Sequence, residues 1–207
     1  MTRTTRLLGA LIAPTLIAAS WPTLAAAPKA FVRDDAHSQI NFSASSRMID
    51  AQGYWDKWDA AITFDADAVD KTTLALDIEA ASVNTRIAAR DKHLRSKDFF
   101  NADTFPAITF KSTSVRATGG QPTAADLGNT QLIIIGDLTI RGITKQVPIP
   151  ATLVFFDRGR NVGRVKGKFT LLRKDYNVGY DPPGNPVENE VGVQFDVAFK
   201  LPAVPMP

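Results

Sequence analysis

Apolar and polar residues alternate along most of the chain from residue 38 onward, as expected of β-strands that bury one face. The last segment, EVGVQFDVAFK, is the clearest case, because every second residue from Val191 to Phe199 is apolar. Seven earlier segments show the same alternation. We therefore predict eight strands, over residues 38–42, 60–64, 73–82, 107–115, 131–140, 147–156, 162–172 and 190–200.

The connections between these segments are mostly short and rich in Gly, Asn, Asp and Pro, as in DRGRN and YDPPGNP. Strands that follow one another so closely favour an antiparallel up-and-down sheet. Closing the sheet into a barrel removes its exposed edges, so the predicted fold is all-β, an eight-stranded antiparallel barrel. A β-sandwich is the alternative. A barrel of this size is either filled by side chains or holds one small ligand.

The alternation predicts which side chains point inward. In VPIPATLVFF it places Leu153 and Phe155 on the inner face. Twelve phenylalanines against three tyrosines and three tryptophans indicate an apolar interior. Composition alone does not distinguish a hollow barrel from a filled one.

One connection, RDKHLRSKDFF and its flanks, is helical in pattern and predicts a short helical lid near residues 86–100 that seals one end of the barrel. Ile87 and Leu94 are seven residues apart, so both are expected to face the core. Asp91 and Arg95 have the spacing of a weak ion pair on the exposed flank. Pro106 is expected to end the helical stretch before the next strand.

The first residues have the three-part pattern of a secretory signal: the basic MTRTTR, the apolar LLGALIAPTLIAAS and the small-residue TLAAAP. The apolar run is short and contains Pro14, which disfavours a membrane-spanning helix. We predict a cleaved signal peptide over residues 1–26, with the cut near Ala26. The remaining residues, 27–207, are predicted to form a single domain in the periplasm.

Charge and cysteine content exclude several classes of function. The chain has 24 Lys+Arg and 21 Asp+Glu, and the signal contains Arg3 and Arg6, so the mature protein has 22 against 21, about +1. With no basic block left, nucleic-acid binding is not predicted. There is no cysteine, which excludes a lipid-anchor cysteine, thiol catalysis and thiolate metal sites.

The remaining candidates for chemistry are weak. His93 has no second metal ligand at helical spacing, and the other histidine, His37, is far away in sequence. No serine stands in the tight glycine-rich turn of a catalytic nucleophile. The carboxylate pairs Asp34–Asp35 and Glu188–Glu190 lie in loop-like segments, where exposed acids are common. We predict no metal, no required cofactor and no enzymatic activity.

Several stretches together resemble the YceI family: DDAHSQINF, ASVNTRIAARDKHLRSKDFFNADTFPAITFKSTSV, GDLTIRGITKQVPI and LLRKDYNVGY with ENEVGVQFDVAFK. They follow in order over nearly all of the mature chain. The resemblance implies a lipocalin-like barrel in a secreted, usually periplasmic, protein that binds long isoprenoid-type or similar amphiphilic lipids. Arg47 stands near the position where the family commonly has a histidine.

The resulting hypothesis is a non-catalytic protein that binds, stores or transports such a lipid. Transient membrane contact and a homodimer are further expectations. The alternative is a filled barrel that serves as a stress-response or interaction module without lipid. The residues expected to contact the ligand are Phe42, Phe64, Leu76, Ile78, Phe100, Phe110, Leu138, Phe169 and Phe195 along the barrel, with Arg47 and Arg90 at its mouth.

Overall fold

The computed structural model describes residues 28–119, 127–181 and 183–203. The predicted signal peptide, residues 1–26, lies outside these ranges. The described chain contains the strands β1 (Lys29–Arg33), β2 (Gln39–Ser46), β3 (Asp50–Trp55), β4 (Trp58–Phe64), β5 (Thr73–Glu79), β6 (Val83–Asn84), β7 (Ala107–Ala117), β8 (Thr130–Ile140), β9 (Ile143–Asp157), β10 (Val162–Leu172) and β11 (Val187–Lys200). One α-helix, α1 (Ala88–Arg95), and four short 3-10 helices, η1 (Asp35–His37), η2 (Val69–Lys71), η3 (Ala80–Ser82) and η4 (Arg173–Tyr176), complete the described elements.

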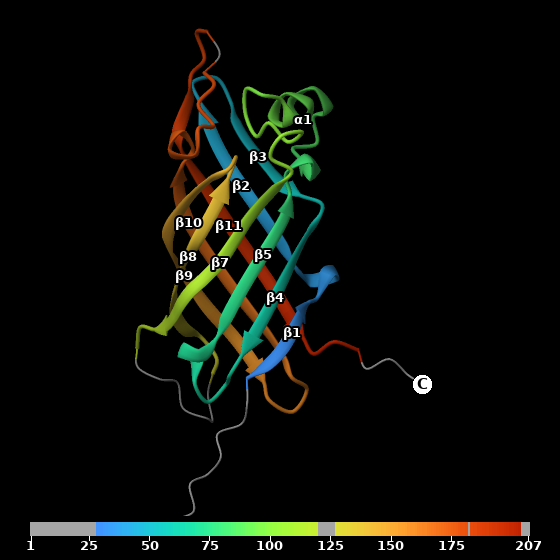
Figure 1. Ribbon diagram of the computed structural model, residues 1–207, viewed down its shortest axis with the longest axis vertical. Coiled ribbons are helices and arrows are strands. Elements are labelled where there is room, and N and C mark those ends of the chain that lie inside the picture. Colours follow the sequence, from blue (N-terminus) through green and yellow to red (C-terminus); the bar gives the residue numbers. More distant parts are fainter. Residues whose placement is uncertain (1–27, 120–126, 182, 204–207) are drawn as a thin grey trace, which may run out of the picture.

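The strands form one antiparallel sheet that closes on itself (Figure 1). The order β1-β4-β5-β7-β8-β9-β10-β11 is closed by pairing of β1 with β11. β2 pairs with the same strand β11, and β3 pairs with β2, so β1–β2 and β3–β4 each act as one long interrupted strand. The result is the predicted closed eight-stranded barrel.

Each of the eight predicted segments contains a strand, but the segment 73–82 was predicted too long, since β5 ends at Glu79 and Ala80–Ser82 form η3. The strands β1, β3 and β6 were not predicted. In β3 the residues that face inward are Ala51, Gly53 and Trp55. Ala51 and Gly53 are too small to be recognised as apolar positions in a period-two pattern. β1 and β6 have only 5 and 2 residues, too few for alternation to be read.

A β-bulge reverses the predicted alternation at the end of β9. Arg164 pairs with Phe155 and Val165 pairs with Leu153, so β9 has one extra residue, Val154, at this point. The prediction that Phe155 faces inward is therefore wrong, and its side chain is 43% exposed. Phe156 points into the barrel instead.

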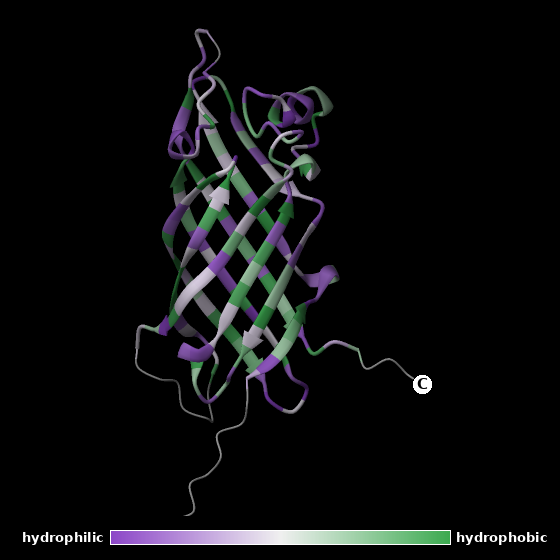
Figure 2. Ribbon diagram, in the orientation of Figure 1, coloured by the Kyte–Doolittle hydropathy of each residue, from purple (hydrophilic) through white to green (hydrophobic). Residues whose placement is uncertain are grey.

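Four phenylalanines, which we call the phenyl plug, close the end of the barrel opposite α1 (Figure 1). Every pair of rings is in contact, with centroids 4.8–6.2 Å apart. The members are Phe31, Phe64, Phe156 and Phe199. Figure 2 shows hydrophobic and hydrophilic residues alternating along the barrel strands. Here the side chains do meet across the barrel axis.

The predicted helical lid is confirmed as α1 at the other end, but two of its details are wrong. Ile87 is 51% exposed, because it precedes the helix with extended backbone and so lies outside the helical spacing to Leu94. Asp91 does not pair with Arg95. Its carboxylate is buried and accepts hydrogen bonds from the backbone N (2.7 Å) and Oγ1 (2.6 Å) of Thr85.

Candidate ligand cavity

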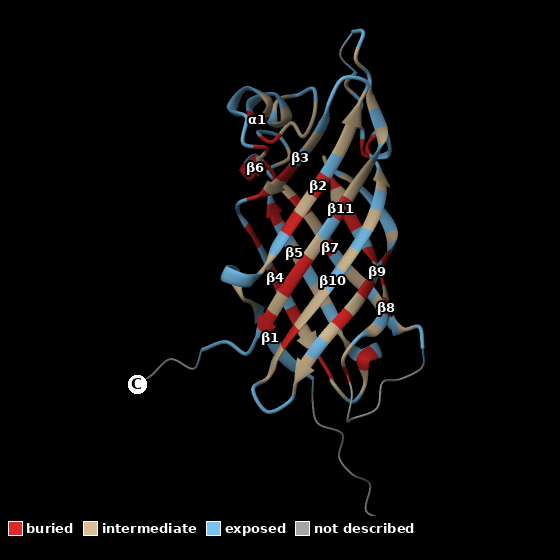
Figure 3. Ribbon diagram, turned by 180° about the vertical axis from the view of Figure 1, so that it is seen from behind, coloured by how far each residue is buried: buried red, intermediate tan, exposed pale blue. Residues whose placement is uncertain are grey.

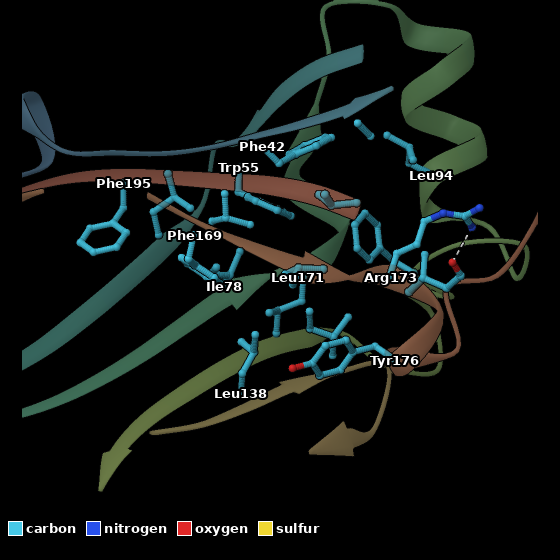
Figure 4. Close-up of a pocket in the computed structure, with 18 of the residues that line it drawn as sticks. Phe42, Trp55, Ile78, Leu94, Leu138, Phe169, Leu171, Arg173, Tyr176 and Phe195 are labelled. Atoms are coloured by element: carbon cyan, nitrogen blue, oxygen red, sulfur yellow. Dashed lines mark hydrogen bonds between the residues drawn. The ribbon is translucent and has the colours of Figure 1, made fainter. Parts of the chain in front are cut away.

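A cavity of about 410 Å³ lies between the phenyl plug and the lid (Figure 4). Its wall is almost entirely apolar and draws on most of the barrel strands. Nine of the residues predicted to contact a ligand lie on this wall: Phe42, Leu76, Ile78, Phe100, Phe110, Leu138, Phe169, Phe195 and Arg90. The structure thus brings these side chains together around one space.

Two predicted residues do not line the cavity. Phe64 faces inward but belongs to the phenyl plug, because β4 carries it past the end of the open space. Arg47 is exposed in the β2–β3 turn, although its neighbours Ser46 and Ile49 do line the cavity. A period-two pattern gives the direction of a side chain and not its height along the barrel, which explains the error at Phe64.

Two of the wall phenylalanines pack over glycines on the neighbouring strand. Phe195 is paired with Gly167, and Phe42 with Gly53. A Cβ atom added at either glycine would collide with the partner's ring, so each ring occupies the space of the missing side chain. These rings lie along the wall instead of projecting across the barrel.

The burial pattern agrees with a hollow interior. The barrel strands carry both buried and intermediate residues (Figure 3). Of the residues that line the cavity, Leu76, Phe169 and Phe195 are half-buried, whereas Ile78 and Phe110 are buried. Inward residues near the plug, such as Leu153 and Phe199, are fully buried. The barrel is therefore packed at one end and open inside at the other.

Three segments surround the mouth of the cavity: the β2–β3 turn, α1 with the turns that follow it, and the β10–β11 connection. Arg173, in η4, organises the last of these. Its buried guanidinium donates hydrogen bonds to the carbonyl oxygens of Val178 (2.7 Å), Tyr180 (3.1 Å), Val187 (2.6 Å) and Glu188 (2.9 Å). All three nitrogen atoms of the guanidinium, Nε, Nη1 and Nη2, therefore donate to acceptors within the protein.

Arg173 also pairs with the carboxylate of Asp181, which in addition binds Lys174 Nζ at 2.9 Å. The hydrogen bond from Lys174, followed by that from Arg173, lowers the pKa of Asp181 below its ordinary value. The charge of Arg173 is therefore already compensated, although the residue lies on the cavity wall.

Arg141, at the tip of the β8–β9 hairpin, joins two of the mouth segments. It donates to the carbonyl oxygens of Lys97 (2.8 Å) and Phe99 (2.8 Å) after α1, and to that of Asn177 (2.7 Å) in the β10–β11 connection. The ring of Phe99 also contacts Tyr180, with centroids 5.6 Å apart. The lid and the β10–β11 connection therefore form one connected structure over the mouth.

Two titratable residues of the lid that line the cavity, His93 and Arg90, make local contacts. His93 lies at hydrogen-bond distance from Asp98, with Nε2 and Oδ2 2.8 Å apart. Arg90 donates from Nε to Thr85 Oγ1 (2.8 Å) and from Nη2 to the Thr85 carbonyl (3.2 Å).

Within the described ranges, no three His, Cys, Asp or Glu residues are grouped so that they could hold a metal ion. In those ranges no helix is both long and apolar enough to cross a membrane.

The sequence analysis missed several wall residues, chiefly Trp55, Trp58, Tyr176 and Arg173. The two tryptophans flank a sharp turn between β3 and β4, where the alternation is interrupted. Tyr176 and Arg173 belong to η4, where period-two alternation does not apply. The sequence signal for these two residues is the stretch LLRKDYNVGY, which resembles the family.

The fold and the cavity define a closed antiparallel barrel with an apolar internal chamber, plugged at one end and lidded at the other. The YceI-like domain family matches residues 31–199, and the chain belongs to this family. Related proteins named UPF0312 protein include one from Shewanella denitrificans, 38% identical over 151 residues (70% of this chain and 74% of that relative). Another, from Ectopseudomonas mendocina, is 34% identical over 161 residues (75% and 79%).

Solved structures of other proteins share the fold. BcnA from Burkholderia cenocepacia superposes with a TM-score of 0.69 at 24% identity, over 80% of this chain and 98% of that one. A polyisoprenoid binding domain from Saccharophagus degradans, implicated in plant cell wall breakdown, superposes with a TM-score of 0.62 at 17% identity, over 84% and 98%.

Proposed function

We propose that this protein binds a long-chain isoprenoid or similar amphiphilic lipid in its barrel, and stores or carries it without changing it chemically. The observation that carries the proposal is the apolar cavity of about 410 Å³ between the phenyl plug and the lid. The Saccharophagus degradans neighbour is described as binding polyisoprenoid, which supports the same class of ligand. The signal-like start of the sequence supports a periplasmic location.

Burial of a hydrocarbon tail is sufficient to drive binding. Each methylene removed from water contributes about 0.8 kcal/mol, so a ten-carbon segment gains roughly 8 kcal/mol before the costs of immobilisation. A tail longer than the chamber has to bend or leave through the mouth. The affinity therefore depends on the length and shape of the buried tail.

The proposal is tested by organic extraction of the purified protein and mass spectrometry of the extract. We expect a prenyl or similar lipid close to one per protein. The variant Leu76→Trp fills the cavity from the inner face of β5 and is expected to retain much less lipid. Ala75→Trp adds the same ring on the exposed face of the same strand and is the matched control. A wild-type protein that contains no lipid and takes none up from vesicles would indicate the filled-module alternative.

We further propose that the mouth contacts membranes during lipid exchange. The three most exposed large apolar side chains of the described chain all lie around it: Met48 (75%), Ile49 (55%) and Ile87 (51%). Exposed Arg47 and Arg86 are adjacent to them in sequence and favour an anionic surface. The predicted homodimer stays a prediction.

A further inference from the structure

Two hydrogen-bond donors on the apolar wall have no acceptor. The hydroxyl of Tyr176 and Nε1 of Trp55 are buried, and neither has a hydrogen-bond partner in the described part of the chain. Both residues line the cavity (Figure 4). Leaving a buried polar group unsatisfied is costly, so native structures pair nearly all of them.

Tyr176 is held rigidly in this position. The residue is 2% exposed and lies in η4, three residues after Arg173, whose hydrogen bonds tie η4 to Val178, Tyr180, Val187 and Glu188. In Figure 4 its hydroxyl points away from η4 and toward Leu138, along the cavity wall. Burial, followed by the charge of Asp175, raises the pKa of Tyr176, so the hydroxyl keeps its proton and remains a donor.

Trp55 reaches the same half of the cavity from β3. Its ring contacts Phe42 (centroids 5.0 Å apart) and Phe100 (6.1 Å), the latter from the turns of the lid. An indole nitrogen can only donate a hydrogen bond. Both unpaired donors therefore lie toward the mouth, away from the phenyl plug, and both require an oxygen acceptor.

We infer that the ligand has a neutral oxygen acceptor (a hydroxyl, ether or carbonyl group) that enters the barrel beneath the lid and accepts hydrogen bonds from Tyr176 and Trp55, with its hydrocarbon tail toward the phenyl plug. This inference rests on the proposed lipid-binding function and adds the polar chemistry of the ligand. Binding thus selects the head group as well as the tail.

The charges around the cavity favour a neutral group at this depth. Arg173 is already paired with Asp181 and four carbonyl groups. Arg90 lies at the lid and donates to Thr85. Because Thr85 is neutral, Arg90 is the place where an anionic head would be expected, whereas a neutral oxygen can be buried beside Tyr176 and Trp55 at a much lower cost.

The test is a competition for the delipidated protein. Vesicles contain equal amounts of geranylgeraniol, the hydrocarbon of the same chain without the hydroxyl, and geranylgeranyl monophosphate, and the lipids recovered with the protein are quantified by mass spectrometry. We expect Tyr176→Phe to lower the recovered ratio of alcohol to hydrocarbon about threefold to tenfold relative to wild type, the range of one neutral hydrogen bond. Trp55→Phe should lower it similarly. Tyr54→Phe, on the outer side of β3, should leave it unchanged.

The outcomes separate this inference from the proposed function. Recovery of alcohol and hydrocarbon in a ratio that neither variant changes overturns the inference and leaves lipid binding intact. Recovery of mainly the phosphate, reduced by Arg90→Gln and not by Tyr176→Phe, overturns it in favour of a charged head at the mouth. Recovery of no lipid at all contradicts the proposed function itself.

The Tm of the delipidated protein is a second measurement, and it distinguishes a tyrosine hydroxyl that binds the ligand from one that stabilises the fold. Because the Tyr176 hydroxyl has no partner, its removal should leave the Tm of the delipidated protein unchanged or slightly raised. A clear fall in Tm for Tyr176→Phe would show that the hydroxyl stabilises the fold, and would overturn its assignment to the ligand.

Discussion

The ring of Phe195 occupies the space that a side chain at Gly167 would fill, directly across the pairing of β10 and β11. The glycine thereby holds an aromatic ring against the wall of the barrel and out of its centre. Gly53 does the same for Phe42, and Gly136 for Phe110. The open volume of the cavity depends on these pairs.

The first prediction concerns Gly167→Ala. The added methyl group collides with the ring of Phe195 and with the backbone carbonyl oxygen of Pro150, so that both the ring and the strand have to shift. This should lower the free energy of unfolding by about 1–3 kcal/mol, as overpacking does. Lipid retention should fall as well, because the displaced ring enters the cavity. Urea denaturation and lipid quantification measure the two effects. Gly179→Ala is the control, since a Cβ there meets nothing within 4 Å. Equal behaviour of the two variants would contradict this role of Gly167.

The second prediction concerns the phenyl plug. Phe199→Ala removes a ring that contacts the three others, and large-to-small changes of this kind cost about 3–5 kcal/mol. Phe155→Ala, in the bulged part of β9, removes an exposed ring and should change stability by about 0.5 kcal/mol or less. Chemical denaturation of both variants checks the difference. A similar loss in both would show that the plug adds no stability of its own.

The third prediction concerns acid stability. Arg164 forms two hydrogen bonds of 2.7 Å to Asp196, and these, with smaller effects of the charges of Arg164 and Lys166, lower the pKa of Asp196 against the opposing effect of burial. The folded protein thus binds this proton less readily than the unfolded chain. The resulting stabilisation is complete above the ordinary aspartate pKa of about 4 and is lost as the pH falls through the folded value.

Asp196→Asn should therefore reduce stability at pH 7 and flatten the fall in stability below about pH 4. Urea denaturation across this range measures the slope. Asp137→Asn, on the exposed face of β8, should keep the wild-type slope. An unchanged slope in Asp196→Asn would mean that this carboxylate is not linked to acid unfolding.

The fourth prediction concerns the mouth. The double variant Met48→Ser, Ile49→Ser removes the two most exposed apolar side chains and should weaken co-sedimentation with anionic vesicles and slow lipid transfer to them. Leu201→Ser changes an exposed leucine beyond the end of β11, at the plug end, and serves as the control. Loss of vesicle binding in the control alone, or in neither variant, would place membrane contact elsewhere or exclude it.

The sequence by itself determined the all-β fold, because period-two alternation and short connections permit few other arrangements. It also identified most of the side chains that surround the cavity, because nine of the eleven residues predicted to contact a ligand line it. The failures have separate structural causes. At Phe155 a bulge changes the alternation, at Ile87 the helix begins one residue later, and at Phe64 the direction is right but the height along the barrel is not.

Only the tertiary structure decided whether the barrel is filled or hollow. The same phenylalanines could meet across the axis, as the four rings of the plug do, or lie along the wall. The choice depends on which strands are neighbours and in which register, since these decide whether an inward ring meets other rings, as Phe199 does, or packs over a glycine beside the open space, as Phe195 and Phe42 do. The unpaired donors of Tyr176 and Trp55 are likewise a property of packing, because no sequence pattern shows which polar atoms lack a partner.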